Sequence, residues 1–148
     1  MIPTVRFRLT RPGAKAPFYA TPGAAAADLC AVLDAPLTLP PMGRAMVPTG
    51  LAIQLPGPEY VALVCARSGL AVKHGLALSN GVGVIDSDYR GEIQVGLVNL
   101  GSETYTLQPG ERLAQLMILP GAQAAFVQAD TLDETDRGAG GFGSTGRF

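Results

Sequence analysis

Hydrophobic and polar residues alternate along several short stretches of this chain. Residues 5–10 (VRFRLT), 92–98 (EIQVGLV) and 103–108 (ETYTLQ) carry an apolar side chain at every second position. A period of two is typical of a strand with one buried face. Residues 60–66 (YVALVCA) and 112–119 (RLAQLMIL) are almost continuously apolar, which predicts strands buried on both faces.

Turn signals separate these stretches and mark where one strand ends and the next begins. They are Pro40-Pro41, Pro56-Gly57-Pro58, Asn80-Gly81 and Pro109-Gly110. Many short strands at this spacing predict an all-β sandwich or barrel. Residues 68–76 (SGLAVKHGL) are the exception and predict a short helix, with Ser68 as candidate N-cap and Gly75 near the end.

The strand pattern stops near Asp130. Residues 131–148 (TLDETDRGAGGFGSTGRF) contain too few apolar side chains to pack on their own, so we expect them to be flexible until something binds them. A chain of 148 residues has room for one domain. We therefore predict a β domain over residues 1–129 and a flexible C-terminal arm over residues 130–148.

Composition and charge narrow the classes of function. Hydrophobic residues make up 47% of the chain, charged residues 16%, and the formal net charge is -1. Such a chain is globular and has no overall field to attract nucleic acid or an acidic membrane. Cys30 and Cys65 form no motif and are expected to be reduced thiols. The first residues lack a signal-peptide pattern, so we expect a cytoplasmic protein with no membrane partner.

The glycine-rich end of the chain is the first candidate for binding chemistry. Gly138, Gly140 and Gly143 fit G-x-G-x-x-G, but we expect no helix after them and therefore no dinucleotide-binding fold. The set Arg137, Phe142, Ser144 and Thr145 offers a charged fork, a flat ring and two hydroxyls, which suits a nucleotide. A disordered glycine-rich terminus is the alternative, and composition alone favours it.

Two internal stretches carry further polar chemistry. Arg67 and Ser68 lie at a predicted strand-to-helix junction, which forms either an anion site or an ordinary capped helix with a surface arginine. Asp86, Asp88 and Tyr89 lie in a glycine-rich loop, where an ionised carboxylate can activate water or simply cap the loop's own amides.

No stretch of the sequence has metal-ligand spacing. Any cation would therefore be Mg²⁺ held mainly by substrate phosphates and water. Asp28, in a run of small residues, is unremarkable alone, and the single histidine, His74, has no acid or nucleophile at a telling distance. The residues thus give no support to covalent catalysis.

Taken in order, five stretches of the chain resemble the motifs of the trimeric dUTPase family. They run from residue 24 to near the C-terminus: AAAADLCA (24–31), ARSGLAVKHG (66–75), GVGVIDSDYRGEI (81–93), GERLAQLMI (110–118) and RGAGGFGSTG (137–146). Each motif is weak alone, but five in the family's order with matching spacing are specific. The resemblance implies a jelly-roll-like β fold and a homotrimer with active sites between subunits.

The resemblance also implies an activity, the hydrolysis of dUTP to dUMP and pyrophosphate, and a role for each matching residue. Asp86 would orient or deprotonate the water that attacks the α-phosphorus, and Tyr89 would pack under the deoxyribose. The uracil edge would be read by Asn80, Gly83, Val84 and Ile85, with Gln94 carried over less directly. The phosphates would be held by Arg67, Ser68, Gly69 and Gln115, with Asp28 at the water shell of Mg²⁺. A lid over the bound nucleotide would be formed by the arm of another subunit, through Arg137, Phe142, Ser144 and Thr145.

Two departures and two alternatives accompany this interpretation. Ala26 stands where the first motif usually has glycine, and Cys30 fills a variable position; neither touches the implied chemistry. A dCTP deaminase shares the fold, but the IDSDYRG and RSGLA stretches favour the hydrolase. A non-catalytic nucleotide-sensing module would be expected to lack the catalytic acid or the arm, and both are present.

Overall fold

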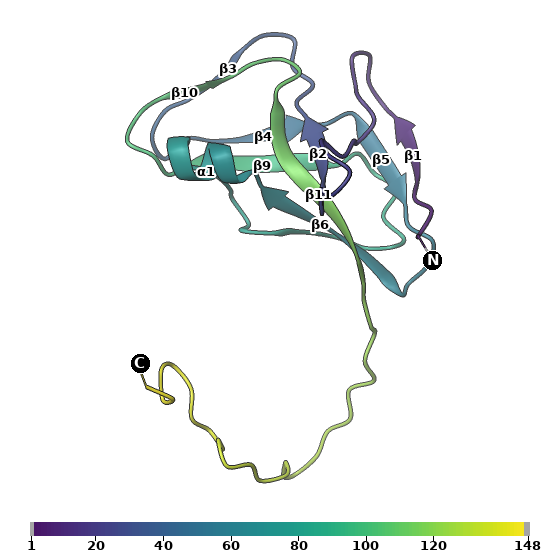
Figure 1. Cartoon of the computed structure of the whole chain (residues 1–148), viewed down its shortest axis with the longest axis vertical. Helices are drawn as coiled ribbons and strands as arrows, with labels where there is room; N and C mark the ends of the chain where they lie inside the picture. The colour runs from purple at the N-terminus through teal and green to yellow at the C-terminus, as the bar shows by residue number, and fades with distance from the viewer. Residues whose placement is uncertain (1, 147–148) are drawn as a thin grey trace.

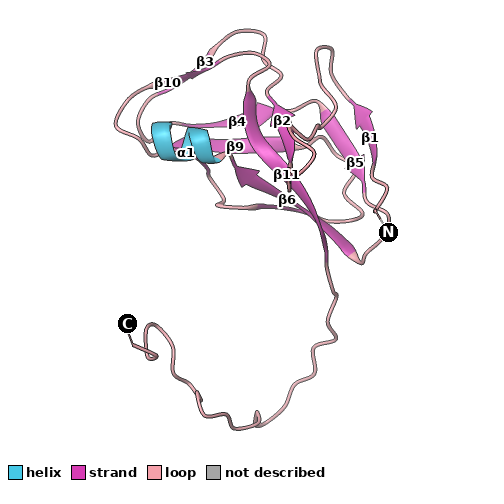
Figure 2. Cartoon of the chain, viewed as in Figure 1, coloured by secondary structure: helices cyan, strands magenta, loops and turns pink. Residues whose placement is uncertain are grey.

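Short antiparallel strands and a single helix make up the computed structural model, which describes residues 2–146 (Figures 1 and 2). The elements in chain order are β1 (Arg6–Leu9), β2 (Ala27–Cys30), β3 (Leu37–Leu39), β4 (Arg44–Pro48), β5 (Leu51–Gln54), β6 (Tyr60–Ala66), α1 (Ser68–His74), β7 (Leu76–Leu78), β8 (Gly83–Ile85), β9 (Gln94–Asn99), β10 (Tyr105–Leu107) and β11 (Arg112–Pro120). The all-β prediction is confirmed.

The strands form one larger sheet and three smaller ones. The larger sheet has the order β2-β11-β6-β8, and a second sheet has the order β4-β9-β7. The remaining strands pair as β1-β5 and β10-β3, and every pairing is antiparallel. The sheets remain open, so the sandwich alternative describes the chain better than a closed barrel.

The core lies between these sheets and follows the period-two pattern in the middle of the chain. Ile93, Val95 and Leu97 are buried, as the alternation in residues 92–98 predicts. The same pattern fails in β1, where Phe7 and Leu9 are 51% and 45% exposed. Strand β1 pairs only with β5, and alternation alone does not tell whether a second layer covers the apolar face.

Strands β6 and β11 are buried on one face only, so the prediction of burial on both faces is wrong for the single chain. Ala62 and Val64 of β6 point into the core, whereas Leu63 and Cys65 between them are partly exposed. Met117 and Leu119 of β11 are likewise partly exposed. The continuous apolar pattern therefore reflects a second apolar face, which the rest of this chain covers only in part.

Helix α1 begins one residue earlier than predicted, because its N-cap residue is Arg67 and not Ser68. Arg67, in an extended conformation, occupies the N-cap position without a side-chain cap, and Ser68 is the first helical residue. The Arg67 carbonyl already accepts the hydrogen bond from the Ala71 amide, so the prediction of Ser68 as N-cap is wrong. Gly75 ends the helix as its C-cap, as expected.

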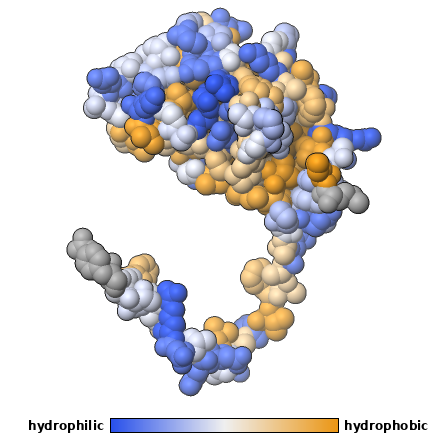
Figure 3. Space-filling model, viewed as in Figure 1, coloured by the Kyte–Doolittle hydropathy of each residue, from blue (hydrophilic) through white to orange (hydrophobic). Residues whose placement is uncertain are grey.

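The chain after Pro120 forms no strand or helix up to residue 146, and it leaves the body at the end of β11 (Figure 1). Phe126, Val127 and Leu132 are 97%, 87% and 88% exposed along it. Apolar surface is visible on the first part of this segment and on the lower edge of the body (Figure 3). Strand structure ends at Pro120, before the predicted domain boundary at residue 129. That boundary stays a prediction.

Two further findings concern the cysteines and the membrane. Cys30 and Cys65 are both free thiols, as expected, and burial raises the pKa of the Cys30 thiol. Between residues 2 and 146, no helix has the length and apolar character needed to cross a membrane.

Candidate active site

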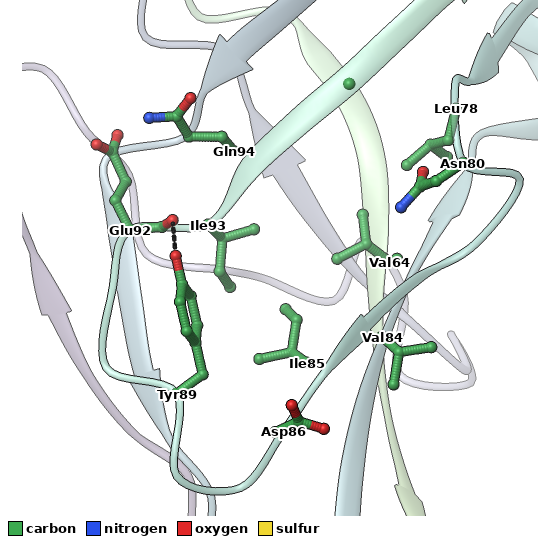
Figure 4. Close-up of a pocket in the computed structure, with 12 residues that line it drawn as sticks. Val64, Leu78, Asn80, Val84, Ile85, Asp86, Tyr89, Glu92, Ile93 and Gln94 are labelled. Atoms are coloured by element: carbon green, nitrogen blue, oxygen red, sulfur yellow. Dashed lines mark hydrogen bonds between the residues drawn. The ribbon is translucent and has the colours of Figure 1, made fainter.

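A cavity of about 230 Å³ opens between strand β8, the loop that follows it and the start of β9 (Figure 4). Seven of the predicted site residues line it: Asn80, Gly83, Val84, Ile85, Asp86, Tyr89 and Gln94. Its other lining residues are Val64, Leu78, Glu92, Ile93 and Gly96. The predicted base, sugar and catalytic residues are therefore brought together within one chain.

Close pairing of β8 with β6 shapes one wall of the cavity. Gly83 lies opposite Val64, and Ile85 lies opposite Ala62. A Cβ atom on Gly83 would come within 3.1 Å of the Val64 Cβ, so a larger residue would push the two strands apart. Gly83 thus allows the two strands to approach closely, and it lies at the edge of the cavity.

The opposite wall is built around Tyr89. Its hydroxyl donates a hydrogen bond of 3.0 Å to the Glu92 carbonyl (Figure 4). The ring lies against Gly91, where any Cβ atom would overlap the phenol. Asn80 faces the same space from the far side, with Ile85 between them (Figure 4). A flat ring and an amide thus flank an apolar floor.

Backbone and side-chain hydrogen bonds to residues 49–51, at the junction of β4 and β5, anchor the loop that carries these residues. The Ile93 amide donates to the Leu51 carbonyl at 2.7 Å, and the buried Thr49 hydroxyl donates to the Ile93 carbonyl at 2.6 Å. The Gly50 amide donates to Glu92 Oε1 at 2.9 Å. Because the end of the loop is fixed at several points, Tyr89 is held on a rigid support.

The cavity contains two carboxylates with different surroundings. Glu92 accepts two hydrogen bonds from Arg11 Nε, at 2.7 and 2.9 Å. The hydrogen bond from Arg11 holds the pKa of the Glu92 carboxyl below its ordinary value of 4.5, although desolvation acts the other way. Asp86 is exposed and, within residues 2–146, its carboxylate forms no ion pair. Asp86 is therefore the carboxylate available to a ligand.

Glu92 was missed by the sequence reasoning. Its partner Arg11 lies 81 positions away along the chain, so nothing in the GVGVIDSDYRGEI stretch that contains Glu92 indicates this contact. The only available signal was that the RGEI stretch adds an acid beside the predicted loop.

The predicted phosphate-binding residues form a second group, away from this cavity. The Asp28 carboxylate, 3% exposed, lies 3.2 Å from Arg67 Nε and 3.0 Å from Arg112 Nη1. Gln115 stands directly opposite Asp28 in the pairing of β11 with β2. Ser68 and Gly69 are exposed just beyond Arg67. None of these residues lines the cavity that contains Asp86.

The described residues could hold the water shell of a Mg²⁺ ion but could not coordinate the ion by themselves. No group of three or more His, Cys, Asp or Glu side chains gathers anywhere in residues 2–146, so no all-protein cage exists there. Asp28 Oδ1 is buried and has no hydrogen-bond partner, which leaves it able to accept a bond from a water ligand of the ion. This donor set suits an ion held chiefly by phosphate oxygens and water.

The predicted arm residues lie outside both groups. The Arg137 guanidinium donates to the Gly140 carbonyl of its own turn at 2.8 Å, and Phe142 is fully exposed with φ 50°. Ser144 and Thr145 are also exposed, and no arm residue lines the Asp86 cavity. In one chain the three groups of predicted site residues are therefore separate.

The fold and the cavity define an open antiparallel β protein with a small-ligand site that combines an apolar floor, hydrogen-bonding groups and a free carboxylate. A family model described as dUTPase matches residues 13–146. A deoxyuridine 5'-triphosphate nucleotidohydrolase of Desulfitobacterium hafniense is 60% identical over 132 residues, covering 89% of this chain and 87% of the relative. The chain belongs to the dUTPase family.

Solved structures agree with this assignment. The dUTPase of Staphylococcus bacteriophage 80alpha, determined with dUPNHPP, has a TM-score of 0.87 at 25% identity and covers 97% of this chain and 99% of its own. A mutant dUTPase from phage phi11 of S. aureus, described for its coordination of a structural Mg(II) ion, has a TM-score of 0.78 at 24% identity, covering 88% and 99%. The fold resembles both along nearly the whole of each neighbour.

Proposed function

We propose that this protein hydrolyses dUTP to dUMP and pyrophosphate, with Asp86 as the group that orients or deprotonates the attacking water. The water oxygen bonds to the α-phosphorus, the bond from that phosphorus to the bridging oxygen breaks, and pyrophosphate leaves. One observation carries this proposal: Asp86 is the cavity carboxylate without a cationic partner in residues 2–146, while Glu92 is held by Arg11. An ionised, unpaired carboxylate is the form needed to accept a proton from water.

The rest of the cavity suits a deoxyuridine. Asn80 and the backbone of Gly83, Val84 and Ile85 supply donors and acceptors at one wall, where they would read the uracil edge. Tyr89 on the other wall would pack under the sugar and leave no room for a 2′-hydroxyl. A site that hydrogen-bonds its substrate rejects analogues by roughly 10⁴–10⁵-fold, since its polar groups are otherwise left unpaired. Gln94, at the rim, is proposed as a further substrate contact.

The phosphates would be held by the second group of residues. Arg67, Ser68, Gly69 and Gln115 are proposed to bind phosphate oxygens. Mg²⁺, when bound with the nucleotide, would supply neutralisation of charge on the phosphate oxygens. Asp28, with its unpartnered Oδ1, would hold a water of that ion rather than the ion itself.

We propose that the protein is a homotrimer in which more than one copy of the chain completes each site. The partly exposed apolar face formed by Leu63, Met117 and Leu119, together with the exposed Phe126 and Val127, supports association of this kind. The separation of the cavity, the phosphate group and the arm within one chain supports sites shared between copies. Arg137, Phe142, Ser144 and Thr145 would then close over the nucleotide bound to another copy.

In the cell, we propose that the reaction keeps uracil out of DNA and supplies dUMP for thymidylate synthesis. The same proposal places the protein in the cytoplasm. Neither statement requires a nucleic-acid or membrane partner, which agrees with the near-zero net charge.

A nucleotide panel tests the proposal. Purified protein with Mg²⁺ is given dUTP, dCTP, dTTP and UTP, and both pyrophosphate and ammonia are measured. We expect pyrophosphate from dUTP and far less from the other three nucleotides, with no ammonia. Ammonia from dCTP would replace the hydrolase with a deaminase, and binding of dUTP without turnover would favour a nucleotide-sensing module.

A further inference from the structure

A buried carboxylate lies between two arginines at the base of the proposed phosphate site. Asp28 is 3% exposed, whereas the side chains of Arg67 and Arg112 are 24% and 44% exposed. An ionised carboxylate in such a place is costly unless it is paired and hydrogen-bonded. Both of its oxygens therefore face a guanidinium, one from β11 and one from the residue that precedes α1.

The two arginines meet Asp28 in different ways. Arg112 Nη1 donates a hydrogen bond of 3.0 Å to Oδ2. Arg67 Nε lies 3.2 Å from Oδ1 but is not aligned for a hydrogen bond, so both of those buried atoms lack a hydrogen-bond partner. Arg112 thus holds the carboxylate firmly, and Arg67 is held near it by charge.

A bulge in β11 brings Arg112 to this position. The pairing of β11 with β2 shifts register between Arg112 and Ala114, so that Cys30 faces Arg112 while Asp28 faces Gln115. Without the extra residue, strict alternation would put Arg112 and Gln115 on opposite faces of the sheet. The bulge places the Arg112 side chain on the face that carries Asp28 and Gln115.

The backbone of Arg112 holds Arg67 as well. Arg67 Nη1 donates a hydrogen bond of 3.2 Å to the Arg112 carbonyl. Arg67 is therefore restrained at Nε by Asp28 and at Nη1 by Arg112, and the outer edge of its guanidinium has no partner within the described chain. Such an edge presents parallel N–H donors in the geometry that suits a phosphate.

We infer that Arg112 is a positioning residue for phosphate binding, which acts by holding Asp28 so that Arg67 keeps its outer N–H groups free for the nucleotide. Without the Arg112 cation, both oxygens of Asp28 would be left to Arg67. The guanidinium would then turn into a two-point pair with the carboxylate, and its donors and charge would be lost to the phosphates. This inference rests on the proposed function, because it assumes that Arg67 binds phosphate.

The test compares a ligand with phosphates to one without. The affinities of the imido analogue dUpNHpp and of deoxyuridine are measured for the wild-type full chain and for Arg112→Met, with and without Mg²⁺. We expect the Kd of dUpNHpp to rise about 10–100-fold in Arg112→Met, the range of a hydrogen bond to a charged group, and the Kd of deoxyuridine to stay unchanged. The effect should persist without Mg²⁺, since it acts through Arg67.

Two further variants complete the design. Arg112→Lys keeps the cation and is expected to restore affinity for dUpNHpp to within about threefold of wild type. Arg44→Met removes an exposed arginine that has no ion pair within residues 2–146, and it should leave both affinities unchanged. If Arg112→Met does not fold, Arg112→Gln keeps a donor for Asp28 and should show a smaller loss of the same selectivity.

Equal losses for dUpNHpp and deoxyuridine, or no loss for either, would overturn the inference. An effect seen only with Mg²⁺ would also overturn it, because Arg112 would then act through the ion. The wild type separates this failure from a failure of the proposed function: if the unmodified protein does not bind dUpNHpp, the dUTP proposal itself is wrong.

Discussion

The Asp86 cavity and the C-terminal arm carry the proposed chemistry in opposite physical states. The cavity is formed by strands and by a loop that is hydrogen-bonded to Thr49, Gly50 and Leu51, where β4 meets β5. The arm, described from residue 130 to 146, has no strand or helix and only local turns. One region is organised before any ligand arrives, whereas the other has almost no packing to organise it.

This difference suggests that the cavity recognises the nucleotide and that the arm closes the site over it. A preformed pocket binds its ligand at a lower ordering cost, which favours selectivity for the base and sugar. An arm that must order on binding loses conformational entropy, but it can exclude water and complete the site only when substrate is present. Changes in the cavity and changes in the arm should therefore have different kinetic signatures.

The largest effect is expected from Asp86→Asn. The amide keeps the size of the side chain but cannot accept the proton of water, so we expect kcat to fall by about a thousandfold or more. Because the cavity walls are unchanged, the Kd of dUpNHpp should remain within a few-fold of wild type. Steady-state kinetics and calorimetric titration measure the two quantities, and a near-normal kcat would refute the role of Asp86.

Deletion of residues 137–148 should have the next largest effect. The cavity does not depend on the arm, so the truncated protein should fold normally and bind deoxyuridine as the wild type does. Loss of closure should lower kcat for dUTP by about a hundredfold, as misplacement of reacting groups does. Unchanged kinetics in the truncated protein, at an unaltered oligomeric state, would show that the arm is not a lid.

The smallest effect is expected from Arg11→Met, which weakens the support of the cavity and should lower Tm. Arg11→Met removes the partner of Glu92, whose pKa is lowered in the folded state. The pair stabilises the fold at pH values above the ordinary pKa of 4.5, and its contribution is lost as the pH falls through the lowered pKa. We expect Tm to drop by about 1–2 °C at pH 7 and the difference to vanish in acid. A difference that grew on acidification would contradict this sign.

Much of the fold could be predicted from the sequence, because local patterns determined it. Alternation located β9 and β10, and the glycine and proline turns separated the strands correctly. Pattern alone could not tell that Phe7 is exposed or that Leu63 is partly exposed, because burial depends on which layers, or which other copies, pack against a strand. The alternation of apolar and polar residues in a strand shows which side chains share a face, but it does not show what packs against that face.

The candidate site was predictable where its residues are adjacent in sequence. The stretch from Asn80 to Gln94 folds back on itself, so one motif provides most of the cavity. Glu92 with Arg11, and Arg112 with Asp28, are contacts across the fold, between residues 81 and 84 positions apart. The position of the Arg112 side chain also depends on a bulge in β11, and the hydrophobic periodicity of the sequence does not predict a bulge.

Mixed oligomers of two defective chains test most directly whether the cavity of one chain is completed by the arm of another. Asp86→Asn and the chain lacking residues 137–148 are co-expressed with different affinity tags, and oligomers that contain both are purified. In a trimer with either ratio of the two chains, one site combines an intact Asp86 with an intact arm, so we predict about one third of wild-type activity. If each arm closes over its own chain, the mixed oligomers will be no more active than the two parents.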